Sequence, residues 1–72
     1  MKIYHYTVIG SGSFPADMLR YDKCWPTDGD SVIKLVGYTV RWEINLASTQ
    51  APTEDRWLSF GCAVQNMREV TT

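Results

Sequence analysis

The sequence predicts a small α+β domain in which a three-stranded, mainly antiparallel sheet carries two or three short helices on one face. Three observations predict it: residues 2–9 and 38–46 alternate as strands do, glycines and prolines interrupt the chain at short intervals, and short amphipathic segments lie between the strands. The expected element order is β-α-α-β-α-β, with the strand order left open. Residues 1–72 are taken as one domain, because so short a chain supports a single core.

The first expected strand covers residues 2–9, which are rich in β-branched and aromatic side chains. The "GSGS" stretch at 10–13 ends it, because glycine frees the backbone and serine competes for local hydrogen bonds. A helix is expected over 14–23, with Pro15 near its first position. Pro26 ends that segment, since a residue before proline is disfavoured in a helical conformation.

A second helix is expected over 27–36. Thr27 is a good N-cap, Asp28 and Asp30 suit the positive end of a helix, and Gly37 can cap its C-terminus. The "SVIKLV" run within this segment fits equally well an extended entry into the next strand.

Residues 38–46 form the clearest element, a strand with one buried and one wet face. The apolar residues Tyr38, Val40, Trp42, Ile44 and Leu46 alternate there with Thr39, Arg41, Glu43 and Asn45. A helix over 52–60 follows, with Thr53 as its cap and Gly61 just past its end. Trp57 and Phe60 of this helix are expected to pack on the sheet, and residues 62–70 are expected to form a third strand.

Net charge and cysteine content narrow the classes of function. The formal net charge is −1 and the sequence pI is near 5.6, so the chain has no overall positive field to attract phosphates. Two cysteines are too few for a disulfide scaffold, and the sequence shows no charged-then-apolar leader and no long apolar run. We therefore expect a cytoplasmic protein with reduced thiols that binds no membrane, and nucleic acid is a disfavoured partner.

The best catalytic hypothesis is a Cys24 nucleophile assisted by His5, the single histidine, with Asp22 or Asp17 orienting the imidazole. Cys24 follows a helix, near its negative end, and nothing in the spacing brings His5 close to it. A buried, unreactive thiol is the favoured alternative.

Metal and phosphate sites also lack their usual sequence signatures. Cys24, Cys62, His5 and a carboxylate could form a metal site, but no short Cys-x-x-Cys or His-x-x-x-His pair anchors one. The "GSGS" turn lacks the Lys-Ser/Thr of a phosphate loop. The sequence therefore predicts no catalytic, cofactor-binding or metal-binding residue and a protein that is not an enzyme.

The three tryptophans have different expected roles. Trp42 and Trp57 share faces with other apolar residues and are expected in the core. Trp25 lies in the corner "MLRYDKCWPTDGDS", residues 18–31, where a helix ends, a proline follows and a new helix begins. We expect its indole to cover the edge of the core, with anchoring of a partner protein as the alternative.

The segment "FPADMLRYDKCWPTDGDS" at 14–31, with "PTEDRWLSFG" at 52–61, resembles short uncharacterised proteins of tailed bacteriophages and prophages that carry an FPxDMLRYDxCWP pattern. The resemblance covers about half of the chain and implies no activity or cofactor. It implies a bacterial cytoplasm as the setting, and small phage accessory proteins act by stoichiometric binding.

Two functions are weighed from these observations. The leading hypothesis is a phage or prophage accessory protein that binds a host or phage protein, such as a defence protein, without catalysis. The alternative is a nucleic-acid module with an aromatic and basic surface. The candidate partner-binding residues are Trp25, Arg20, Lys23, Thr39, Arg41, Glu43 and Asn45, and the alternative surface is Tyr4, Tyr6, Arg41, Arg20 and Lys23.

Self-association through the strand at 38–46 is a further expectation to test. If two copies paired antiparallel about Trp42, Arg41 would face Glu43 twice and a homodimer would result. The favoured alternative places this strand in the centre of the sheet, where it has no free edge.

Overall fold

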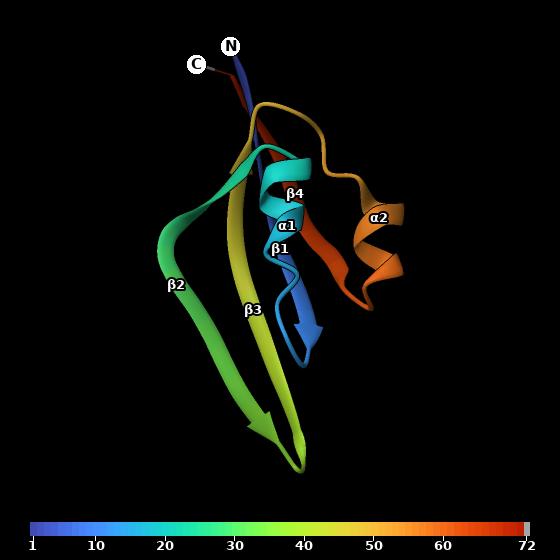
Figure 1. Ribbon diagram of the computed structural model, residues 1–72. Helices are drawn as coiled ribbons and strands as arrows, with labels where there is room; N and C mark the ends of the chain where they lie inside the picture. The colour runs from blue at the N-terminus through green and yellow to red at the C-terminus, as the bar shows by residue number, and fades with distance from the viewer. Residues whose placement is uncertain (72) are drawn as a thin grey trace.

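A computed structural model describes residues 1–71, and the side chains of all of these except 28–34. Six elements follow one another along the chain (Figure 1). They are β1 (Lys2–Ser11), α1 (Asp17–Tyr21), β2 (Cys24–Val36), β3 (Thr39–Ser48), α2 (Glu54–Ser59) and β4 (Ala63–Thr71).

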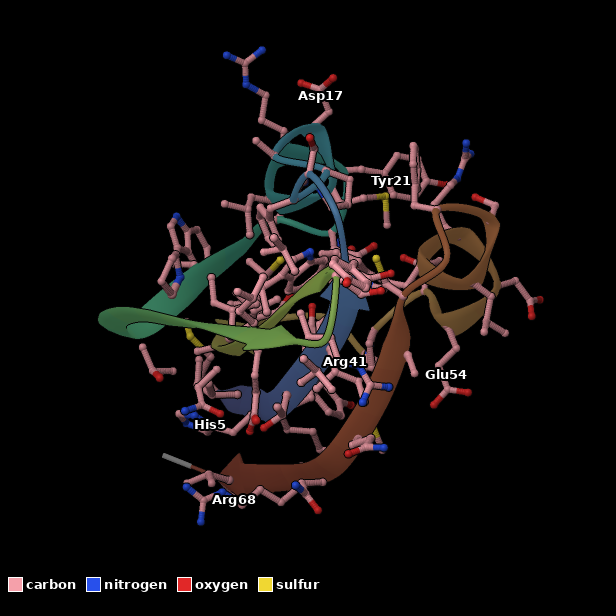
Figure 2. The ribbon with its side chains drawn as sticks, turned by 90° about the horizontal axis from the view of Figure 1, so that it is seen from below. His5, Asp17, Tyr21, Arg41, Glu54 and Arg68 are labelled. Atoms are coloured by element: carbon pink, nitrogen blue, oxygen red, sulfur yellow. The ribbon has the colours of Figure 1, made fainter. Side chains whose placement is uncertain are left out.

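The strands form one four-stranded antiparallel sheet in the order β2-β3-β1-β4. β1 and β2 therefore run parallel to each other with β3 between them, and the element order β-α-β-β-α-β is that of the ferredoxin-like, or split βαβ, topology. Both helices lie on the same side of the sheet (Figure 2). The expected α+β class, the antiparallel sheet and the helices on one face are confirmed, while the expected count of three strands is wrong.

The expected helix over 27–36 is wrong, because these residues belong to β2, the strand that the sequence analysis did not predict. β2 pairs with β3 up to Val36, which lies opposite Thr39. Gly37 has a φ of 65° and begins the two-residue connection of a hairpin, which favours glycine at its first position. It is a turn residue and not a helix cap. The side-chain roles expected of Asp28, Asp30, Val32 and Ile33 lie outside the described side chains.

The core lies between the sheet and the two helices. Its buried apolar residues come from all parts of the chain: Tyr6, Val8, Met18, Cys24, Trp42, Ile44, Leu46, Trp57 and Cys62. Trp42 and Trp57 are core residues as expected, whereas Phe60 is 54% exposed. Phe60 occupies the last position before Gly61, where α2 has already ended, so its ring is not directed onto the sheet.

Trp42 lies flat over a gap left by Gly10, its neighbour on β1. A Cβ atom at Gly10 would come within 2.5 Å of the indole ring. Phe14 also packs against the indole, with an edge-on ring contact at 4.7 Å between centroids. The glycine is therefore required by packing, because any larger residue would displace this tryptophan.

A β-bulge interrupts the pairing of β1 with β4. Between the pairs His5–Arg68 and Thr7–Gln65, β4 contains one residue more than β1. Asn66 lies within the bulge with a φ of 54°, a left-handed conformation that asparagine tolerates better than most residues.

The strand expected to mediate self-association, β3, lies between β2 and β1 and is hydrogen-bonded on both edges. Pairing with a second copy about Trp42 is therefore wrong, and the central placement is confirmed. Among residues 1–71, no helix is long and apolar enough to cross a membrane.

Candidate functional site

The corner between α1 and β2 contains a buried carboxylate, Asp22, which is 4% exposed. It accepts a hydrogen bond from the indole N–H of Trp57 at 2.7 Å and one from the backbone N–H of Thr53 at 3.2 Å. The Thr53 hydroxyl also donates to this carboxylate. Three donors from the second half of the chain therefore converge on one side chain.

This convergence makes Asp22 the cap of a helix to which it does not belong. Thr53 is the N-cap residue of α2, and its own side chain makes no capping hydrogen bond within the helix. Asp22 instead binds the Thr53 N–H, and its backbone carbonyl accepts a hydrogen bond from the Ser48 hydroxyl at 2.8 Å. The corner thus joins α1, β3 and α2, which is a structural role.

The catalytic arrangement considered from the sequence is not assembled. Cys24 is buried on the helix side of the sheet, where its thiol contacts the Met18 carbonyl, whereas His5 belongs to the opposite face. Burial raises the pKa of the Cys24 thiol, so the thiolate that a nucleophile requires is disfavoured. The expectation that Cys24 is a buried, unreactive thiol is confirmed as far as burial goes. Among the described residues, no group of three or more His, Cys, Asp or Glu side chains could hold a metal ion.

The face of the sheet away from the helices, which we call the open face, displays a row of residues from all four strands. Trp25 of β2 and His5 of β1 both lie opposite Ala47 of β3, and His5 also lies opposite Arg68 of β4. Figure 2 shows His5 and Arg68 together on the side opposite the helices.

Trp25 does not cover the core edge, because its side chain is 57% exposed. Strand alternation explains this result: Cys24 and Trp25 are consecutive in β2, so when the thiol points into the core the indole points away from it. The Trp25–Pro26 bond is trans. The corner therefore contributes Asp22 and Cys24 to the buried side of the sheet. Trp25, three residues after Asp22, is exposed on the open face.

A groove of about 420 Å³ runs beside this row. His5, Arg68 and Asn66 line one part of it, and Thr27 and Asn45 line another. The Asn45 amide oxygen accepts a hydrogen bond from the Thr7 hydroxyl at 2.8 Å, and the Asn45 carbonyl accepts one from Thr27 at 3.3 Å. These hydrogen bonds hold the Thr27 and Asn45 part of the groove in place.

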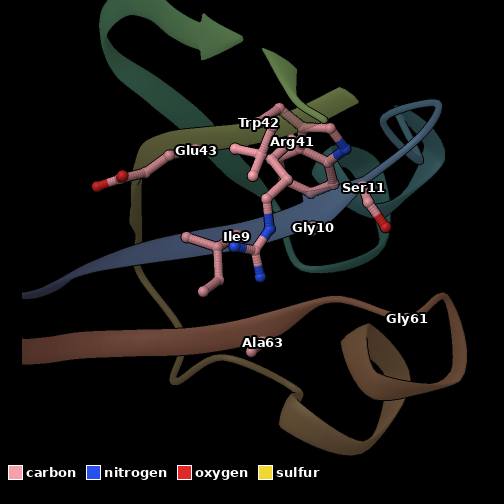
Figure 3. A pocket seen from close by; sticks show the side chains of 9 residues that line it. Ile9, Gly10, Ser11, Arg41, Trp42, Glu43, Gly61 and Ala63 are labelled. Carbon is pink, nitrogen blue, oxygen red and sulfur yellow. The ribbon is translucent and has the colours of Figure 1, made fainter. Parts of the chain in front are cut away.

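A second hollow of about 370 Å³ lies further along the open face. Figure 3 shows the Arg41 side chain crossing β1 beside Ile9 toward Ala63, with Glu43 directed the other way. Gly10 and Trp42 border the same hollow. The open face is therefore uneven, with charged and apolar side chains interspersed along it.

The structure brings together most of the candidate partner-binding residues. Those on the open face are Trp25, Thr39, Arg41, Glu43 and Asn45, all from β2 and β3. Arg20 and Lys23 belong to α1 and the turn after it, in the helix layer. Thr27 and Arg68 were not among the candidate site residues predicted from the sequence, and His5 was considered there only for catalysis and for a metal site. The alternation within residues 2–9 could have indicated His5, since it places Tyr4 and Tyr6 on the other side.

The aromatic and basic surface of the nucleic-acid alternative is not assembled. Tyr6 is 2% exposed and Tyr4 packs against the core, both on the helix side of the sheet, whereas Arg41 lies on the open face. Stacking on bases requires exposed rings, so these tyrosines cannot supply it together with that arginine.

Comparisons with known proteins do not add to this geometry. No protein-family model matches the chain, and neither the curated proteins nor the solved structures contain a match. A ferredoxin-like topology by itself carries no function, because many unrelated activities occur on one fold.

Proposed function

We propose that this protein binds another protein, without catalysis, through the open face of its sheet, with Trp25 as the main anchor. The setting is the bacterial cytoplasm, with a host or phage protein such as a defence protein as partner, as the resemblance to short phage and prophage proteins implies. The proposal concerns one surface, defined by the exposed residues of β2 and β3 with His5 and Arg68 beside them.

The observation that carries the proposal is the exposure of Trp25 at the end of a row that spans the sheet. More than half of this indole is exposed, at 57%, and burying it in a complex would remove a large apolar area from water. Tryptophan is among the residues that contribute most to protein–protein affinity. The adjoining groove offers the amide of Asn45 and the hydroxyl of Thr27 as polar contacts around it.

The open face fits a protein better than a nucleic acid. Sheets that bind single strands present aromatic rings on their central strands. Here the outward positions of the central strands hold other residues: His5, Thr7 and Ile9 on β1, and Arg41, Glu43, Asn45 and Ala47 on β3. A single exposed indole on an outer strand suits an anchor in a protein interface.

Site-specific photo-crosslinking tests the proposal. A benzophenone amino acid replaces Trp25 in one variant and Phe60 in a control, since Phe60 is an equally exposed ring, at 54%, in the helix layer. After irradiation in bacterial lysate, we expect a discrete crosslinked protein from position 25 only. The Trp25→Ala variant should then bind that purified protein about 30-fold more weakly, as loss of an interface anchor of about 2 kcal/mol predicts.

The same products from both positions, or an unchanged affinity of Trp25→Ala for the captured protein, would contradict binding through the open face. Turnover of a small molecule by the purified protein would contradict the non-catalytic part of the proposal.

A further inference from the structure

We infer that the groove beside Trp25 receives an acidic side chain of the partner, with Arg68 and His5 binding its carboxylate. This inference rests on the proposed function and specifies the chemistry of the partner. It follows from three properties of the groove: the placement of Arg68, the shape of the row and the order of charges along the open face.

Arg68 is placed to bind an anion. It lies directly opposite His5 across β1 and β4, so the two side chains are neighbours on the open face, with Cβ atoms about 5 Å apart. The ion pair found among the described residues joins Lys2 to Glu69, on the other side of β4. Arg68 has no such partner among the described side chains, and a guanidinium presents paired donors that match a carboxylate.

The row also leaves room for the ligand. Ala47 separates Trp25 from His5, so the indole and the imidazole stand on strands about 9.5 Å apart with only a methyl group between them. An extended partner segment can place an apolar side chain against Trp25 and a neighbouring carboxylate against Arg68. The amide of Asn45 and the hydroxyl of Thr27 lie in the same groove as further hydrogen-bonding groups.

The order of charges selects a protein carboxylate over a nucleic-acid phosphate. Arg68 and His5 lie at one end of the open face, Glu43 follows on β3, and Arg41 lies beyond it. A phosphodiester chain carries a negative charge at every nucleotide, so one crossing this face would meet the Glu43 carboxylate. A protein segment can place a single acidic residue at Arg68 and a neutral or basic one at Glu43.

Fluorescence anisotropy with two labelled peptides tests this inference. One peptide alternates glutamate with valine, and the other replaces each glutamate by glutamine. We expect the glutamate peptide to bind about five- to tenfold more tightly, and this preference to weaken as salt is added. Arg68→Gln should lower the affinity for the glutamate peptide about three- to fivefold, the effect of one exposed ion pair.

The matched control is Arg20→Gln, which removes the same charge from the exposed surface of α1. This variant should bind the glutamate peptide within about twofold of the original protein, since rim charges remote from a contact contribute little. Equal binding of both peptides, an equal loss in Arg20→Gln, or absence of binding to the glutamate peptide would overturn the inference. Tighter binding of a single-stranded oligonucleotide would overturn it in favour of a phosphate ligand.

Trp25→Ala separates this inference from the proposed function. If Trp25→Ala weakens both peptides while Arg68→Gln changes neither, the open face is the binding surface and its preference for acidic residues is wrong. If neither variant changes the binding of either peptide, both proposals fail.

Discussion

Asp22 and Trp25 lie three residues apart in the same corner and have opposite surroundings. Asp22, an acid, is 4% exposed and accepts hydrogen bonds from Trp57 and Thr53. Trp25, one of the largest apolar residues, is 57% exposed. The usual relation between polarity and burial is reversed at both positions.

The difference shows that hydrogen bonding and strand alternation, and not side-chain polarity alone, decide which of the two side chains is buried. A buried carboxylate is tolerated where its hydrogen-bonding capacity is filled, and Asp22 meets that condition by holding α2 in place. An exposed indole contributes little to the folded state and is free to contact a partner. The helix side of the sheet thus holds the buried contacts that stabilise the fold, and the open face holds the surface through which we propose binding.

The largest loss of stability is expected on removal of Asp22, on the helix side of the sheet. Asp22→Ala should lower the free energy of unfolding by about 3–5 kcal/mol, because it leaves buried donors of Thr53 and Trp57 without an acceptor. Urea unfolding followed by circular dichroism measures this loss. Asp17→Ala, an exposed acid of α1, should cost less than about 1 kcal/mol. Similar losses in the two variants would contradict the capping role of Asp22.

A smaller loss of stability is expected on substitution of Gly10, the residue of β1 that faces the Trp42 indole. Gly10→Ala should destabilise the protein by about 1–3 kcal/mol, because the added methyl group enters space occupied by the Trp42 indole. Ser11→Ala, the exposed neighbour, should change stability by less than about 0.5 kcal/mol. Thermal unfolding of both variants gives the comparison, and an unchanged midpoint for Gly10→Ala would show that the indole can move away.

Alkaline pH should destabilise the fold through groups that are buried on the helix side of the sheet. Burial raises the pKa of Cys24 and Cys62 above their ordinary value, and burial followed by the neighbouring Cys24 raises that of Tyr6. The folded protein therefore retains protons that the unfolded chain releases above about pH 8.5. Stability is fully present below that pH and decreases as the pH rises further.

The urea midpoint at neutral pH and near pH 9.5 measures this decrease. The double variant Cys24→Ala/Cys62→Ala should be less stable at neutral pH and lose less on raising the pH. An identical midpoint at both pH values would mean that these groups are not shielded in the folded protein.

The smallest expected effect concerns Trp25 itself. Trp25→Ala should change the free energy of unfolding by less than about 1 kcal/mol, as surface substitutions do. An indole packed at the core edge would instead cost about 3–5 kcal/mol on removal. Chemical unfolding of this variant distinguishes an exposed indole from one packed at the core edge. A loss of about 3–5 kcal/mol would show that Trp25 stabilises the fold.

Much of the fold could be predicted from the sequence, and the errors have physical causes. The alternation within β3 predicted its central place and the burial of Trp42, Ile44 and Leu46. It was wrong for Tyr38 and Val40, which are exposed because they lie at the hairpin end of the sheet, beyond the part that the helices cover.

The predicted helix over 27–36 was wrong because Thr27, Asp28 and Asp30 are equally common at helix N-termini and in turns. The ladder between β2 and β3 is interrupted after the pair Pro26–Leu46 and resumes at Ser31 opposite Ile44. Pairing of Ser31 to Val36 with β3 therefore overrides the local preference for a helix.

The candidate site was predicted in part for a related reason. The wet face of β3 could be identified from alternation alone, so Arg41, Glu43 and Asn45 were chosen correctly as neighbours. Trp25 was assigned to the core edge because its strand was not recognised, and Asp22 had no signal of its own, since Thr53 and Trp57 lie more than thirty residues away. Arg68 depends on the pairing of β4 with β1, which no local pattern specifies.

The bulge at Asn66 determines which charge β4 shows on the open face. If β4 kept all its residues but paired without the bulge, the pairing of Thr7 with Gln65 would continue unshifted, and Arg68 would lie opposite Tyr4 on the helix side. Glu69 would then occupy the open face in its place. Deleting the extra residue, Asn66, would instead remove the bulge and leave Arg68 opposite His5. The charge on this part of the open face therefore depends on the pairing register of β4, and a change of one residue in register reverses its sign without any change in composition.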